Sequence, residues 1–83
     1  MLTHYLQAAM HRATYKVLED DGSFIGEIPG LQGVYANADT LEACRDELQE
    51  VLEGWILLGL HLQHHIPVLD GIDLNPRIQQ EVA

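Results

Sequence analysis

The sequence predicts an α+β protein in which a three-stranded antiparallel sheet follows one helix and precedes another, with both helices packed on one face of the sheet. Two observations predict this order. Apolar residues recur at helical spacing over residues 2–12 and 39–63, and they alternate between turn residues over 13–37. The chain has 83 residues, 47% of them hydrophobic, which suits one globular domain. We assign residues 1–71 to that domain and residues 72–83 to a short C-terminal tail.

The N-terminal segment has a single apolar stripe, which is typical of a short amphipathic helix. A helix of this length is marginal in water by itself, so we expect the stripe to lie on the sheet. Its members are Leu2, Tyr5, Leu6, Ala9 and Met10.

Two alternating stretches, residues 13–19 and 24–28, predict a β-hairpin. Asp21 and Gly22 between them are a strong hairpin signal, because glycine adopts positive φ at little cost. Pro29 should end the second strand, because proline has no N–H to donate to a ladder.

A third, shorter strand is predicted at residues 34–37, after a turn flanked by Gly30 and Gly33. Residues 66–69 are expected to be extended, as a candidate short fourth strand. Pro67 suits a sheet edge and disfavours helix in the residues before it.

The long helix begins near Asp39 and Thr40 and runs to about Gln63. Asp39 can cap it, with Glu42 reaching back in a capping box, and Thr40 is the alternative cap. The apolar stripe of the helix consists of Leu41, Cys44, Leu48, Val51, Leu52, Trp55 and either Leu58 or Leu62.

The last turns of this helix, residues 55–60, are apolar on every side. The sheet can cover one side, so we expect a second subunit on the other and a homo-oligomer, either a dimer or a tetramer. The candidates for that interface are Trp55, Ile56, Leu57 and Leu60.

The charge limits the classes of partner. Thirteen acidic and four basic side chains give a formal charge of −9, which repels phosphates, so we expect no direct binding of nucleic acid. The acidity either keeps a small protein soluble or complements a basic protein partner.

Nothing in the sequence predicts export or membrane insertion. The N-terminus lacks the apolar core of a signal peptide, and the longest apolar stretch is far shorter than the ~20 residues of a membrane span. The single cysteine, Cys44, rules out an internal disulfide and fits a reducing compartment. We expect a cytoplasmic protein.

Three groups of residues are candidates for chemistry, and each has a structural explanation. His61, His64 and His65 have the spacing of metal ligands on a helix, but no glutamate stands between them and a helix C-terminus favours histidine anyway. Cys44 falls on the apolar stripe, where cysteine behaves as a small hydrophobic residue.

Carboxylates of a metal-dependent nuclease are the third candidate group. They would have to converge from the hairpin and the long helix, whereas a hairpin tip is solvated. The two sets are Glu19, Asp20 and Asp21 on the hairpin, and Asp46, Glu47 and Glu50 on the helix. We therefore predict no catalytic, metal or cofactor site.

The sheet face away from the helices is the candidate partner surface. Its residues are either contacts to a partner or ordinary exposed side chains. Besides Thr14, they are Lys16, Leu18, Ile25 and Glu27.

The ordered combination of these segments resembles the HicB-like antitoxin family over roughly residues 13–69. The resemblance rests on Tyr15-Lys16-Val17-Leu18-Glu19, Asp21-Gly22, Phe24, Ile28-Pro29-Gly30-Leu31-Gln32-Gly33, Asp39-Thr40-Leu41-Glu42-Ala43, the helix with Leu52 and Trp55, and Ile66-Pro67. It implies a partial ribonuclease-H-like arrangement and a role in a toxin–antitoxin system, in which the domain blocks HicA, a small basic toxin that cleaves mRNA.

The chain departs from that family in two places. A helix at 2–12 precedes the first strand, and the dozen residues after Gly71 contain one basic residue, Arg77, too few for a DNA-binding module. We expect a stand-alone HicB-like module that binds a basic toxin through its acidic exposed surface and is not an enzyme. The alternative is a homo-oligomeric structural or small-ligand-binding protein without a toxin partner.

Overall fold

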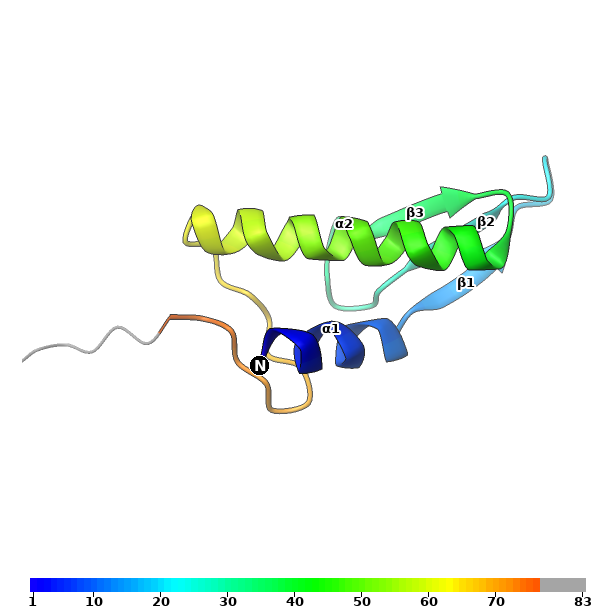
Figure 1. Cartoon of the computed structure of the whole chain (residues 1–83). Helices are drawn as coiled ribbons and strands as arrows, with labels where there is room; N and C mark the ends of the chain where they lie inside the picture. The colour runs from blue at the N-terminus through cyan, green and yellow to red at the C-terminus, as the bar shows by residue number, and fades with distance from the viewer. Residues whose placement is uncertain (77–83) are drawn as a thin grey trace, which may run out of the picture.

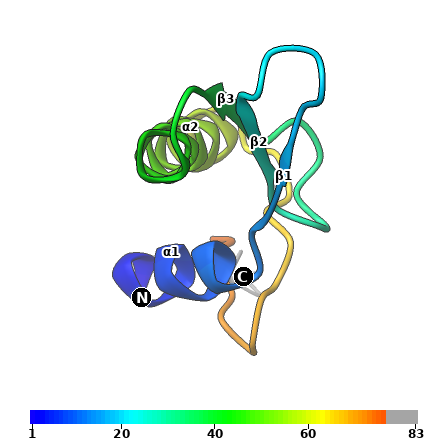
Figure 2. The same ribbon diagram turned by 90° about the vertical axis from the view of Figure 1, so that its right-hand side faces the viewer.

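The computed structural model describes residues 1–76 and has the predicted α+β fold (Figure 1). The elements are α1 (Leu2–His11), β1 (Thr14–Val17), β2 (Phe24–Glu27), β3 (Tyr35–Ala38) and α2 (Leu41–His61). The strands form one antiparallel sheet in the order β1-β2-β3, and both helices lie on the same side of it (Figure 2). The predicted tail extends beyond this part of the chain, since residues 77–83 lie outside the described residues.

The inner face of the sheet is built for the close approach of α2, which packs over β2 and β3. Tyr15, Gly26 and Ala36 are paired across the three strands on this face. A Cβ atom at Gly26 would lie 2.8 Å from the Tyr15 ring and 3.2 Å from Cys44 Sγ. Glycine at this position is therefore what lets the Tyr15 ring and the helix share one side of β2.

The hairpin predicted from Asp21 and Gly22 is confirmed. Gly22 has φ of +70°, and Leu18 N–H donates to the carbonyl of Ser23 at 2.8 Å. Asp21 Oδ1 accepts hydrogen bonds from both the N–H and the hydroxyl of Ser23, at 2.9 and 2.7 Å. Asn37 Nδ2 on β3 donates to the same hydroxyl at 2.9 Å, so the turn is fixed to the far strand.

The third strand is also confirmed, one residue later than predicted. Pro29 lies just past the end of β2 and is exposed, as expected for a residue that ends a strand. Gly33 has φ of +90° in the loop that follows, a conformation that favours glycine.

Of the two caps that the sequence allowed for α2, Asp39 and Thr40, the structure has Thr40. Thr40 is extended, with φ of −124° and ψ of 158°, and its hydroxyl accepts a hydrogen bond from Ala43 N–H at 3.1 Å. Because the helix begins one residue later than Asp39 requires, Glu42 is the second helical residue and does not occupy the capping-box position.

The buried face of α2 has a spacing of four residues from Cys44 to Ile56 and then of three to Gly59. Leu41 and either Leu58 or Leu62 were expected on the apolar stripe, but all three are exposed, at 45%, 58% and 50% respectively. The buried face drifts slowly around the helix as it crosses the sheet, so it turns away from these three positions. Its members are Cys44, Leu48, Leu52, Ile56 and Gly59.

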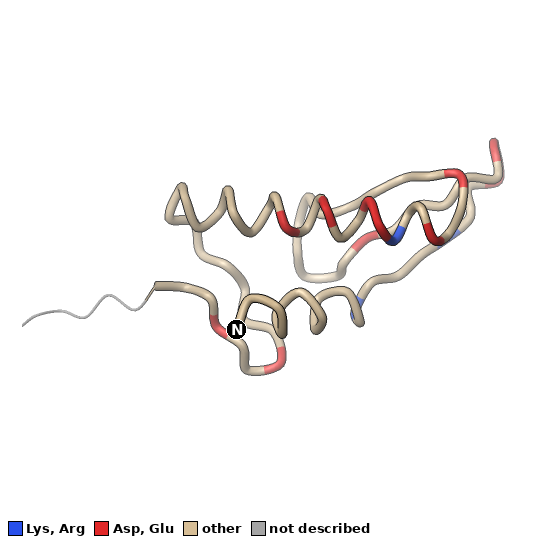
Figure 3. The backbone as a smooth tube through the Cα atoms, in the orientation of Figure 1, with Lys and Arg blue, Asp and Glu red and all other residues tan. Residues whose placement is uncertain are grey.

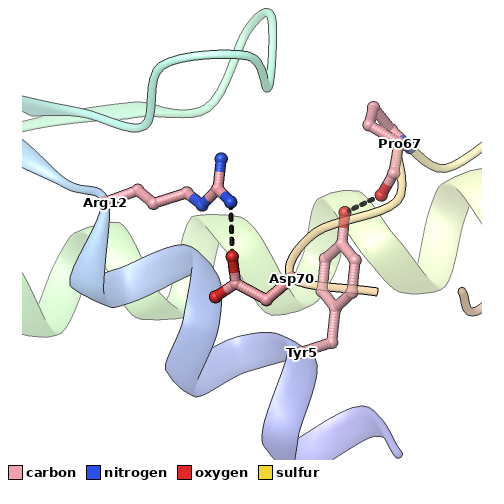
Figure 4. Close-up of polar contacts among 4 residues, drawn as sticks. All are labelled: Tyr5, Arg12, Pro67 and Asp70. Carbon is pink, nitrogen blue, oxygen red and sulfur yellow. Dashed lines mark hydrogen bonds and ion pairs between the residues drawn. The ribbon is translucent and has the colours of Figure 1, made fainter. Parts of the chain in front are cut away.

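Helix α1 packs against α2 and against the segment that follows α2, rather than over the sheet as predicted (Figure 2). Tyr5 is fully buried, and its hydroxyl donates to the Pro67 carbonyl at 2.6 Å. Arg12, at the end of α1, forms an ion pair with Asp70 of the same segment (Figure 4).

The segment at 66–69 forms no fourth strand of the sheet within the described residues. It turns back on itself instead: Leu69 and Ile72 form an isolated bridge, closed by Asp70 and Gly71 with φ of +48° and +75°. These angles suit a two-residue hairpin turn, for which Asp-Gly is a preferred sequence.

The side chain of Asn75 takes the place of a pairing strand for Ile66. It accepts from Ile66 N–H and donates to the Ile66 carbonyl, both at 2.7 Å. Ile66 is 1% exposed and packs on α2 at Gly59, where a Cβ would lie 2.7 Å from Ile66 Cδ1. The segment therefore completes the core under the C-terminal half of α2.

Candidate interaction surface

The outer face of the sheet lies opposite both helices, and no element of residues 1–76 is packed over it (Figure 2). Side chains along a strand point alternately to the two faces of the sheet, so two residues of each strand lie on this face. The register places them in two rows across the sheet: Thr14, Glu27 and Tyr35, then Lys16, Ile25 and Asn37.

Three of the four predicted contact residues lie on this face. Lys16 and Glu27 are exposed, and Ile25 is half-buried between them at the centre of the sheet. Leu18 is half-buried just beyond the end of β1, at the base of the hairpin. The structure therefore brings Lys16, Ile25 and Glu27 together and leaves Leu18 at the margin.

Two hollows flank β2 on this face, and both are bordered by Ile25 and Glu27. One, of about 570 Å³, extends under the loop at 28–34 to Tyr35. The other, of about 230 Å³, lies toward β1, where Thr14 and Lys16 form its wall. The surface offers shallow depressions suited to side chains of a partner, on either side of a central aliphatic residue.

Tyr35 is the residue of this surface that sequence reasoning missed. It is 62% exposed and is paired with Glu27 across the sheet. The strand pattern contained a signal for Tyr35, because neighbouring residues of a strand point to opposite faces. Val34 and Ala36 are buried, so Tyr35 between them lies on the outer face. Tyr35 begins the edge strand β3, and an exposed aromatic ring on an open sheet face is typical of a protein interface.

Acidic side chains surround the sheet on several elements (Figure 3). They lie at the hairpin tip and along the first half of α2, where Arg45 is the basic neighbour. The hydrogen bonds from Ser23 lower the pKa of the Asp21 carboxyl below its ordinary value of 3.8. The hairpin tip therefore remains negatively charged down to acidic pH.

The histidines and carboxylates considered for chemistry do not form a centre. His61, His64 and His65 are all exposed, and no group of three or more histidine, cysteine or acidic residues in the described chain could hold a metal ion. The acidic residues of the hairpin lie in the turn between β1 and β2, and the others lie along α2 (Figure 3).

Cys44, Tyr5 and Tyr15 contribute to the packing of the core. Cys44 is fully buried, as its place on the apolar stripe predicted, and its thiol contacts the Ala36 carbonyl at 3.6 Å. Burial raises the pKa of Tyr5 and of Tyr15, and Arg12 and Arg45 respectively oppose this effect.

The four residues predicted for a subunit interface have different environments. Ile56 is fully buried in the core of its own chain, which removes it from any interface. Trp55 and Leu60 are half-buried against the core, whereas Leu57 is 61% exposed.

The comparisons with known proteins agree on a family and a fold. A model of the UPF0150-like family matches residues 4–67. The crystal structure of TTHA0281 from Thermus thermophilus superimposes with a TM-score of 0.82 at 40% sequence identity, covering 88% of this chain and 96% of that one. No curated protein matches the sequence. Among residues 1–76, no helix combines the length and apolar character needed to cross a membrane.

Proposed function

The chain belongs to the UPF0150-like family, and we propose that it is a HicB-type antitoxin-like module that binds and masks a small basic protein. The partner would be a HicA-type toxin that cleaves mRNA in the cytoplasm. The sequence resemblance to the HicB-like family over residues 13–69 suggests the class of partner, and the open sheet face supports docking there.

The observation that carries this proposal is the uncovered outer face of the sheet with Tyr35 exposed on it. Truncation of a few anchors, most often aromatic, costs most of the affinity of a protein interface. Ile25 supplies an aliphatic centre beside that ring, and the two hollows lie on either side of it. Glu27 and Lys16 border the same area with charge of both signs.

The net charge of −9 supports a basic partner. Opposite charge accelerates encounter and rejects acidic competitors, while the apolar centre supplies affinity. A protein that binds RNA presents a basic surface, and an acidic module that covers this surface prevents RNA from reaching it. Inhibition by this route needs no chemistry from the antitoxin, only occupation of the partner's RNA-binding face.

The test is to co-express the chain with each small basic protein encoded in its gene neighbourhood and to measure the affinity of any pair that co-purifies. Tyr35→Ala should weaken binding about tenfold or more, the loss expected for an interface anchor. Leu41→Ala is the matched control, because Leu41 is also exposed, at 45%, but lies at the start of α2. Absence of a complex, or equal losses in the two variants, would exclude the proposal.

A further inference from the structure

We propose that a second copy of this chain docks on the outward face of the C-terminal half of α2, with the two α2 helices antiparallel. This surface lies on the helix side of the molecule, opposite the outer sheet face (Figure 2). The proposal is therefore independent of the proposed function, and both surfaces can be occupied in one assembly.

The exposed face of α2 changes character along its length. The first half of α2 contains several acidic residues (Figure 3). Among them, Glu47 and Glu50 are exposed. After Gly54 the exposed face becomes apolar: Leu57 is 61% exposed and Leu58 is 58% exposed. Two adjacent, largely exposed leucines in a helix that already buries a complete face against its own core are an apolar surface without a partner in the described chain.

Packing within residues 1–76 gives no reason for glycine at position 54. Glycine inside a helix costs about 1 kcal/mol relative to alanine. Within residues 1–76, a Cβ at Gly54 would meet nothing within 4 Å, so no contact in this part of the chain requires glycine there, whereas Gly59 is needed because Ile66 packs on it. A helix from a second copy explains Gly54, because a missing side chain lets two helix backbones approach closely.

A small hollow beside the leucines provides a receiving site. It has a volume of about 120 Å³ and lies between Trp55, Leu58 and the histidines His64 and His65. An aliphatic side chain from the other helix fits a depression of this kind, as in knob-into-hole packing. The half-buried Trp55 ring forms one wall of it.

The charges select the antiparallel arrangement. Side-by-side parallel helices would align the acidic half of α2 with its own copy, which is repulsive. An antiparallel crossing at Leu57 and Leu58 separates the acidic halves and directs each toward the histidine-bearing end of the other helix. In that arrangement Gly54 of one copy faces His61 of the other, since the two positions are equally far from the crossing point.

The first experiment measures mass by light scattering over a range of concentrations. The wild-type chain should have twice the mass of one chain, and Leu58→Glu should be a monomer with an unchanged circular dichroism spectrum. Leu41→Glu is the control on the same helix and should remain a dimer. A monomeric wild type up to millimolar concentration, or a folded Leu58→Glu variant that still dimerises, overturns the proposal.

The second experiment determines the orientation. Gly54→Cys mixed with His61→Cys should form a disulfide between the two variants, whereas each variant alone should not, because only antiparallel helices bring these positions within bonding distance. Cys44 is buried and does not compete. Disulfides within each single variant would indicate parallel helices and contradict the antiparallel arrangement.

Gly54→Ala gives two effects of opposite sign. Alanine favours the helix, so a dilute chain should become more stable, whereas the added methyl group should weaken dimerisation severalfold. If the dimer of Gly54→Ala is as tight as that of the wild type or tighter, close helix contact at Gly54 is excluded.

Discussion

Replacing Tyr5 with phenylalanine removes a single hydroxyl group from the contact that holds α1 to the chain after α2. The Tyr5 ring is fully buried, and its hydroxyl donates to the Pro67 carbonyl at 2.6 Å (Figure 4). Phenylalanine keeps the ring and its packing. The substitution therefore isolates one hydrogen bond that joins residues 62 positions apart in the sequence.

Tyr5→Phe should lower the free energy of unfolding, because the Pro67 carbonyl loses its hydrogen-bond donor. A buried polar group deprived of its hydrogen bond costs about 1–3 kcal/mol. For a domain of this size each kcal/mol lowers the melting temperature by about 4–8 °C. The neighbouring ion pair between Arg12 and Asp70 is exposed, and such pairs contribute about 0–1 kcal/mol. Tyr5→Phe should therefore be the more damaging of the two changes.

Urea unfolding of Tyr5→Phe and Arg12→Ala, followed by circular dichroism, measures both free energies under one condition. Arg12→Ala is the control, because it breaks a contact between the same two segments at the surface. If the two variants lose the same stability, or if Arg12→Ala loses more, the buried hydrogen bond does not dominate this junction and the reasoning fails.

Two further predictions concern the sheet. Gly26→Ala should cost about 1–3 kcal/mol in urea unfolding, because the new Cβ would overlap the Tyr15 ring and approach Cys44; unchanged stability would refute this packing. The lowered pKa of Asp21 means that its hydrogen bonds from Ser23 contribute fully to stability above pH 3.8 and that this contribution is lost as the pH falls further. Asp21→Asn should flatten that acid dependence below pH 3.8, and identical unfolding profiles in this range would argue against it.

The fold was predictable because its local signals agree with one another. Alternating residues, the turn at Asp21 and Gly22, and the helical spacing of the long helix each indicate the element that forms. What the sequence left open was the exact face of α2. A buried face with four-residue spacing drifts around the helix, so Leu58 and Leu62 can be assigned to the core or to the surface until the neighbouring elements are placed.

The path of the chain after α2 was harder to predict, because it depends on contacts between distant residues. Asn75 pairs with the backbone of Ile66, and Tyr5 binds the Pro67 carbonyl. Neither contact has a local sequence signal. Asp70 and Gly71 did carry one, since Asp-Gly marks a tight hairpin here as it does at the first turn.

The candidate interaction surface was predictable only in part. Lys16, Ile25 and Glu27 follow from strand alternation alone, given a sheet covered on one side. Tyr35 required the register of the third strand, which begins one residue later than predicted. Which residues of different strands share a surface can therefore be predicted only when the strand register is known.

Separate substitutions can test the two proposed surfaces independently. Substitutions at Tyr35 should affect a basic partner and leave self-association unchanged. Substitutions at Leu58 should affect self-association and leave the sheet face intact. A chain that loses both properties with either substitution would instead have a damaged fold, which circular dichroism would detect.

Hydrogen exchange in the presence of a basic partner shows whether the outer sheet face is the docking surface. With the HicA-type protein bound, amide exchange should slow at residues 14–16, 25–27 and 35–37 and remain unchanged in the first half of α2. Protection confined to α2, with none on the three strands, would contradict the account.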